Sequence, residues 1–159
     1  MERTKYNVDK NVEKRTYDGI VFDSIMEMKF YRDVVLPQVE SGEITHYELQ
    51  REYILQPAFR NGNKSVKPIV YVADYYLEYA DGRVEVIDIK GCPDSVAKLK
   101  RKMFWYVYPN LTYRWICYSQ IDGNEENHGW VDYEYVNQQR KIRKLAKKKK
   151  ELEETEDGK

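Results

Sequence analysis

Residues 84–91, VEVIDIKG, place Asp88 and Lys90 two positions apart at the end of a run of β-forming residues. The pattern Asp/Glu-x-Lys is weak by itself, because about three matches are expected by chance in a chain of this composition. Three occur, at Glu27–Lys29, Asp88–Lys90 and Asp157–Lys159. Only the second lies on an expected strand, where residues two apart project from the same face.

A second acid is expected beside this pair. The run 68–79, PIVYVADYYLEY, reads as a strand, and the Asp-Gly signal in ADGR (80–83) predicts a hairpin that pairs it with 84–91. Asp74 follows Val70 and Val72 at alternate positions, as Asp88 follows Val84 and Val86, so each strand is predicted to run apolar, apolar, then acidic along one buried face. Two converging carboxylates repel unless a cation lies between them, and Mg²⁺ is the natural candidate. The alternative is an Asp88–Lys90 or Asp74–Lys90 ion pair on a wet strand surface.

The elements around these strands follow from periodicity and capping signals. A helix is expected over FDSIMEMKFYRDVV, with Ser24 and Glu27 as a capping box, Pro37 kinking or ending it and Gly42 as a stop. ITHYELQREYILQP (44–57) reads as a strand. A helix capped by Asp94 or Ser95 and a strand at 111–119 follow, and the intervening helix favours a parallel crossover. The chain is expected to end in a basic helix.

The fold class predicted from this order is α/β, with an α-β-β-β-α-β core, a mixed central sheet flanked by helices and a basic C-terminal helix. The predicted organisation is an arm over 1–19, one domain over 20–136 and a charged helix or tail over 137–159. Residues 140–150 carry eight positive charges and residues 151–157 five negative ones. This block is read either as a solvated helix end or as a nucleic-acid-binding arm.

Composition excludes several other chemistries. Cys92 and Cys117 make no disulfide framework and, like His46 and His128, have no zinc-ligand spacing. The chain has no glycine-rich phosphate loop and no GxSxG elbow. It also has no apolar run near 18 residues and no signal-peptide pattern, so a cytoplasmic location without membrane association is expected.

Taken together, these motifs resemble the PD-(D/E)xK nuclease superfamily, which has the restriction-endonuclease-like fold. The resemblance rests on FDSIMEMKFY, Glu48-x-Gln50, Val-Ala-Asp74-Tyr and Ile-Asp88-Ile-Lys90-Gly, in this order over residues 20–118. The motif series is similar to that of small phage-encoded Holliday junction resolvase-like endonucleases. By this similarity, Glu27 would be an additional carboxylate supplied by a helix. Ala73 replaces the proline that names the motif, and Lys102-x-x-x-Tyr106 stands where exonuclease branches have Gln-x-x-x-Tyr.

The resemblance implies a Mg²⁺-dependent DNA endonuclease of a bacterial or phage-infected cell, with Mn²⁺ as a substitute metal. The enzyme would act as a homodimer on branched DNA in phage recombination or processing. Glu27, Asp74, Asp88 and the Ile89 carbonyl would be metal ligands, and Lys90 would orient water or stabilise the phosphate. Basic residues expected to contact DNA are Lys64, Lys67, Lys98, Arg101 and Lys102. Two purely structural alternatives remain open. Glu27 would then only cap its helix, and Lys98–Lys102 would form a solvated helix face. The alternative functions are a non-catalytic DNA-binding module on this fold and a nicking or restriction-type nuclease.

Overall fold

The structure is a computed structural model that describes residues 11–156 of the 159-residue chain. Residues 1–10 of the predicted arm and the Asp157–Lys159 match lie outside the described residues. The chain divides between Arg114 and Trp115 into two compact units, each described by itself below. The predicted boundaries at 19/20 and 136/137 stay predictions.

The first unit begins with short elements and then a three-part helical run. A 3₁₀ helix η1 (Val12–Arg15) precedes a small hairpin of β1 (Thr16–Tyr17) and β2 (Ile20–Val21). The helical run consists of α1 (Ile25–Phe30), a π-helical turn η2 (Tyr31–Val35) and α2 (Leu36–Glu40). The Ser24 cap is confirmed, because its Oγ accepts from the Glu27 backbone N–H and donates to Glu27 Oε1.

Pro37 does not end this helix, contrary to one of the two expectations for it. It lies at the start of α2, directly after the π-helical turn in which the Leu36 N–H bonds to the Tyr31 carbonyl, and the helix continues through it. The run ends instead at Gly42, whose φ of +78° and N–H bond to the Val39 carbonyl make the expected glycine stop.

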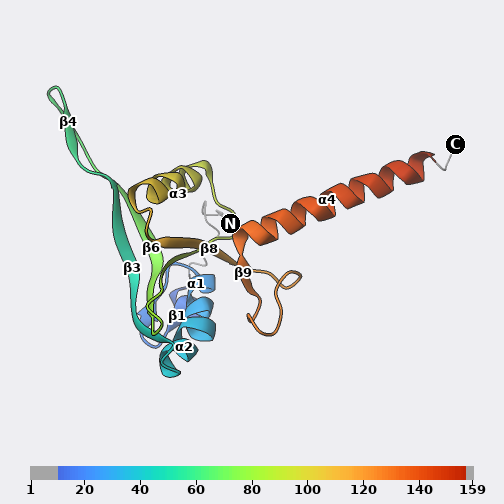
Figure 1. The fold of residues 1–159 in the computed structure, drawn as a ribbon, viewed down its shortest axis with the longest axis horizontal. Helices are drawn as coiled ribbons and strands as arrows, with labels where there is room; N and C mark the ends of the chain where they lie inside the picture. The colour runs from blue at the N-terminus through green and yellow to red at the C-terminus, as the bar shows by residue number, and fades with distance from the viewer. Residues whose placement is uncertain (1–10, 157–159) are drawn as a thin grey trace. The chain divides into compact units, whose positions relative to one another are not determined.

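Three long strands form the framework that carries the candidate site. They are β3 (Ile44–Gln56), β6 (Ile69–Tyr79) and β7 (Val84–Ile89), and each is antiparallel to the next. The ADGR turn is confirmed: Gly82 has φ +86° and the Tyr79 N–H donates to the Arg83 carbonyl. Between β3 and β6 the chain adds an unpredicted hairpin of β4 (Phe59–Asn61) and β5 (Lys64–Val66), drawn at the tip of the long strands in Figure 1.

Helix α3 (Ser95–Val107) covers an aromatic core in this unit. Asp94 is its N-cap, as predicted, and accepts from the Ala97 N–H. Phe104 is fully buried, and its ring centroid lies 5.0 Å from that of Tyr53 and 4.5 Å from that of Tyr113. Such tilted and edge-on ring pairs add to the energy of area burial. The aromatic side chains of the strands therefore serve mainly to pack α3.

The prediction for the faces of β6 is wrong for its valines. Val72 is 40% exposed, whereas Tyr71, Ala73, Tyr75 and Leu77 are buried. Strand β6 has apolar side chains at both odd and even positions. The odd-numbered ones, which include the rings of Tyr71 and Tyr75, form its buried face. On β7 the neighbours are buried as expected, since Val86 is 0% and Asp88 1% exposed.

The second unit contains the end of strand β8, the strand β9 and a long helix. Strand β8 (Thr112–Tyr118) begins in the first unit, and its later residues pair antiparallel with β9 (Trp130–Asp132). Asp122 accepts from the Arg143 guanidinium at 2.7 and 3.0 Å, which ties the β8–β9 loop to α4 (Tyr133–Glu156). The charged C-terminal segment is thus helical over its described part.

The protein is a mixed α/β structure with a five-stranded sheet in the order β3-β6-β7-β8-β9. The parallel step predicted between the third and fourth core strands stays a prediction. In the part of the chain that the structure describes, no helix combines the length and the apolar character needed to cross a membrane.

Candidate active site

The predicted acids approach one another where β6, β7 and α1 meet. Strands β6 and β7 pair Tyr75 with Ile87, and the same register continued by one residue places Asp74 opposite Asp88. Glu27 reaches the same place from α1, where the buried Tyr75 hydroxyl donates to its backbone carbonyl at 2.7 Å. Glu27 is 7% and Asp88 1% exposed. Three carboxylates from three elements are thereby gathered in a largely desolvated region.

The electrostatics of these acids reflect their mutual repulsion. Burial, opposed by the Ser24 hydroxyl and reinforced by the charges of Asp23 and Asp88, raises the pKa of Glu27 to about 7. Burial, followed by repulsion from Asp88 and Glu27, raises the pKa of Asp74 well above its ordinary value. Both acids are therefore destabilised as anions, which is the condition under which a bound cation is stabilising.

Lys90 supplies the positive charge of the cluster. Its Nζ lies 2.5 Å from Asp88 Oδ2, directly after the end of β7. Burial lowers the pKa of Lys90, but the charges of Asp88, Asp74 and Glu27 together outweigh it, so the pKa stands above its ordinary value. Lys90 is therefore an ammonium at neutral pH and is suited to stabilise phosphate charge rather than to accept a proton. The Asp88–Lys90 ion pair considered as an alternative is present, with Asp88 buried and Lys90 half-buried.

The remaining contacts fix the side chain of Asp74. Its Oδ2 accepts from the Ile89 backbone N–H at 2.7 Å, and its Oδ1 lies 3.5 Å from Gln50 Nε2. Gln50 has a φ of +54°, a left-handed backbone that is costly for a residue with a side chain. Beside Asp74 and Gln50 is a cavity of about 70 Å³, lined also by Phe22 and Asp23. It is large enough for one or two water molecules.

The donor set offers a cation two acidic side chains rather than a preformed cage of three. Glu27 Oε2 is buried and has no hydrogen-bond partner among the described residues. Over residues 11–156, however, no group of three or more His, Cys, Asp or Glu side chains forms a ready-made metal cage. In the structure Lys90 balances the charge of Asp88, so a cation would have Glu27, Asp74 and their attached waters as its most accessible partners.

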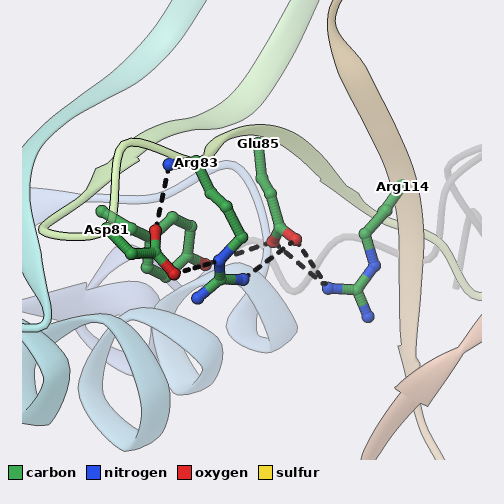
Figure 2. Close-up of polar contacts among 5 residues, drawn as sticks. Asp81, Arg83, Glu85 and Arg114 are labelled. Carbon is green, nitrogen blue, oxygen red and sulfur yellow. Dashed lines mark hydrogen bonds and ion pairs between the residues drawn. The ribbon is translucent and has the colours of Figure 1, made fainter.

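A second buried acid shows what a purely structural carboxylate looks like in this chain. Glu85, three residues before Asp88, is 8% exposed. Arg83 and Arg114 point at its carboxylate from opposite sides in Figure 2, with nearest nitrogen–oxygen distances of 3.8 and 3.2 Å. The Tyr79 hydroxyl also donates to it at 3.1 Å. Glu85 is thus neutralised by cations, in contrast to Glu27 and Asp74.

The basic residues predicted to contact DNA do not form one cluster around the acids. Lys64 and Lys67 are exposed on and beside β5, and Lys98 and Lys102 are exposed on α3. Arg101 is half-buried, with its guanidinium 4.5 Å from the Trp105 ring centroid. Its neighbour Lys100 donates to the Val70 carbonyl at 2.7 Å and so ties α3 to β6.

The sequence alone assigns no role at the site to Gln50 or Tyr75. In the structure Gln50 Nε2 lies 3.5 Å from Asp74 Oδ1, and the Tyr75 hydroxyl donates to the backbone carbonyl of Glu27. The available signal was position, because Tyr75 follows Asp74 and Gln50 lies in the strand before it. The strained backbone of Gln50 leaves no trace in the residue type.

Residues 3–122 of the chain match the model of a protein family described as "Protein of unknown function (DUF1064)". The chain belongs to this family. The match spans η1 to the start of the β8–β9 loop and so includes every residue of the candidate site in this DUF1064 protein. No curated protein matches the chain. The family description names no activity.

Proposed function

We propose that this DUF1064 protein is a metal-dependent DNA endonuclease of the PD-(D/E)xK type, with a restriction-endonuclease-like core. The observation that carries the proposal is the gathering of Glu27, Asp74 and Asp88 beside the ammonium of Lys90 in a buried region. Carboxylates that raise one another's pKa favour a bound cation, and the Lys90 ammonium beside them can contact an anion. A metal ion together with a phosphodiester satisfies both requirements.

Glu27 and Asp74 would hold Mg²⁺ or Mn²⁺, with Asp88 and the Ile89 carbonyl as the further donors that the sequence motif suggests. A bound metal of this kind lowers the pKa of water and neutralises charge on the phosphate. Lys90 contributes a fixed positive charge to the phosphate, and Asp88 holds Lys90 in place. The Ile89 N–H and Gln50 orient Asp74.

The proposed substrate is branched DNA, such as a four-way junction in phage recombination or DNA processing, and the proposed active form is a homodimer. A junction has two-fold character, so a two-fold dimer presents two sites to paired strands. This part of the proposal is supported by the similarity of the motif series to resolvase-like enzymes. A nicking or restriction-type activity is distinguished from it by the products.

The test is cleavage of labelled four-way junction and linear duplex in Mg²⁺, Mn²⁺ or EDTA. We expect metal-dependent paired cuts across the junction, abolished in Asp74→Asn, Asp88→Asn and Lys90→Met. Glu85→Gln is the matched control, because it removes a buried carboxylate from the same strand without touching the cluster, and it should retain activity if circular dichroism shows it folded. Absence of cleavage on every substrate, or full activity in Lys90→Met, contradicts the proposal. Tight binding without cleavage would favour a non-catalytic DNA-binding module.

A further inference from the structure

The hairpin formed by β4 and β5 extends the long strands of the first unit into solvent. We call residues 57–68 the basic arm. Its strands pair Phe59 with Val66 and Asn61 with Lys64, across a turn in which Gly62 has φ +58°. Every residue of the arm is exposed except Val66, which is half-buried. Figure 1 shows it continuing from the ends of β3 and β6, away from the helices of that unit.

The arm buries almost nothing, so it contributes little to folding. An isolated two-stranded hairpin is marginal in water, and this one is supported mainly by the β3–β6 pairing, which runs to Gln56 and Ile69. It nevertheless presents Phe59 with 48% of its surface exposed. An exposed aromatic on a hairpin without a core is a feature that a binding partner explains.

The charge of the arm selects the class of partner. Arg60, Lys64 and Lys67 lie within it, and residues 53–73 contain no Asp or Glu. The whole chain carries 27 acidic residues and has a net charge of zero, so this acid-free stretch is a local departure. Three cations without a neighbouring carboxylate complement a polyanion.

The number of residues between the arm and the acids sets an upper limit on the distance between them. Asp74 and Asn63, at the arm's tip, are eleven positions apart along β5 and β6. At about 3.3 Å per residue, this chain spans at most about 36 Å. One turn of B-DNA is about 34 Å long, and the major groove is about 12 Å wide and admits a two-stranded β-ribbon.

We propose that the basic arm binds duplex DNA in the groove about one helical turn from the phosphate held at Lys90. Arg60, Lys64 and Lys67 contact backbone phosphates, and Phe59 packs against the sugar and base edges. This inference rests on the proposed nuclease function for the position of the cut, but the binding itself does not require catalysis. The arm thereby sets the length of flanking duplex that a substrate must have.

The first experiment measures binding of a labelled 30-bp duplex in EDTA over a series of NaCl concentrations. The variant Arg60→Gln/Lys64→Gln/Lys67→Gln keeps the hairpin and removes its charge. Loss of three phosphate contacts should reduce the slope of log K against log salt by about 3. Between 50 and 200 mM NaCl, the wild type should therefore lose about 40-fold more affinity than the variant.

A matched control removes three exposed basic residues outside both the arm and the C-terminal basic block, as Lys14→Gln/Lys29→Gln/Arg32→Gln. This control should keep most of the wild-type salt slope. Equal effects of the two triple variants would overturn the inference, because net charge rather than the arm would then account for binding. An unchanged slope in the arm variant would overturn it directly.

The second experiment varies the duplex length on either side of the cut. Wild-type cleavage should fall when the flanking duplex is shorter than about 10 bp, whereas a variant joining Gln56 to Ile69 by an Asn-Gly turn should be indifferent to this length. Length-independent cleavage by the wild type overturns the placement of the arm. If no DNA is cleaved at all, the nuclease proposal fails, and the metal-free salt series still decides whether the arm binds DNA.

Discussion

Glu27 offers the sharpest test of the candidate site. Its carboxyl is buried and repelled by neighbouring acids, and its Oε2 has no hydrogen-bond partner among the described residues. Its pKa is raised from the ordinary 4.5 to about 7, by burial first and by Asp23 and Asp88 after it. A carboxyl whose folded pKa is raised stabilises the fold fully below about pH 4.5, and this stability is lost as the pH rises through 7. The unfolding free energy of the wild type is therefore expected to fall between about pH 4.5 and pH 7.

The size of the effect follows from the two pKa values. At about 1.4 kcal/mol for each pKa unit, the rise from 4.5 to about 7 corresponds to about 3 kcal/mol of unfolding free energy. In Glu27→Gln this contribution is absent, while the side chain still accepts from the Ser24 hydroxyl. The stability of the variant relative to wild type should accordingly improve by about 3 kcal/mol between pH 4.5 and 8.5.

The assay is urea unfolding in EDTA at four or five pH values, followed by fluorescence of the tryptophans. Glu85→Gln is the control, since its carboxylate is held by Arg83 and Arg114, and it should be less stable than wild type without the same improvement at high pH. A Glu27→Gln variant that parallels wild type at every pH would refute the repulsion argument.

Metal extends the same experiment. At pH 8.5, MgCl₂ at ten times its dissociation constant should stabilise the wild type by about 1.4 kcal/mol. Glu27→Gln and Asp74→Asn should show a much smaller gain, because each removes an anion that the cation would neutralise. Equal stabilisation of wild type and both variants would mean that Mg²⁺ binds elsewhere.

Three further predictions concern the framework of the site. Phe104→Ala should cost about 3–5 kcal/mol in urea unfolding, because it empties the centre of the α3 core; a loss below 1 kcal/mol would contradict that packing. Tyr75→Phe should cost about 1 kcal/mol by removing the hydroxyl bond to the Glu27 carbonyl, and it should lower cleavage more than DNA binding. Gly82→Ala should cost about 1 kcal/mol through its φ of +86°, since an added Cβ meets no atom within 4 Å; an unchanged midpoint would contradict this.

Local chemistry explains which parts of the fold could be read from the sequence. The Ser24 and Asp94 caps, the Asp-Gly turn and the Gly42 stop each need only a few neighbouring residues, and all four are present. The buried face of β6 is hard to predict because apolar residues occupy both parities, with Val70 and Val72 on one and Tyr71 and Leu77 on the other. Which set is buried depends on the packing of Phe104, a residue 33 positions beyond Tyr71.

The hairpin strands of the basic arm are also hard to recognise in the sequence. Its two three-residue strands lie between Pro57 and Pro68 and contain Gly62, so turn signals dominate the sequence. Pairing is sustained by the continuation of the β3–β6 ladder, which is a long-range property. Similarly, Asp74 and Asp88 could be paired through a short turn, whereas the approach of Glu27 depends on how α1 packs against Tyr75.

The acids and the basic arm carry opposite charges and are therefore expected to have opposite electrostatic effects on DNA. Three carboxylates offset by one lysine would repel a phosphate backbone, whereas the acid-free arm, separated from them by at most about 36 Å of chain, would attract it. A divalent cation at Glu27 and Asp74 would remove the first obstacle without altering the second. If both proposals hold, Mg²⁺ should tighten DNA binding in Lys90→Met, where catalysis is lost, and the arm's share of the salt slope should stay the same. The metal would then control access to the cut site, and the arm would control which duplex is presented to it.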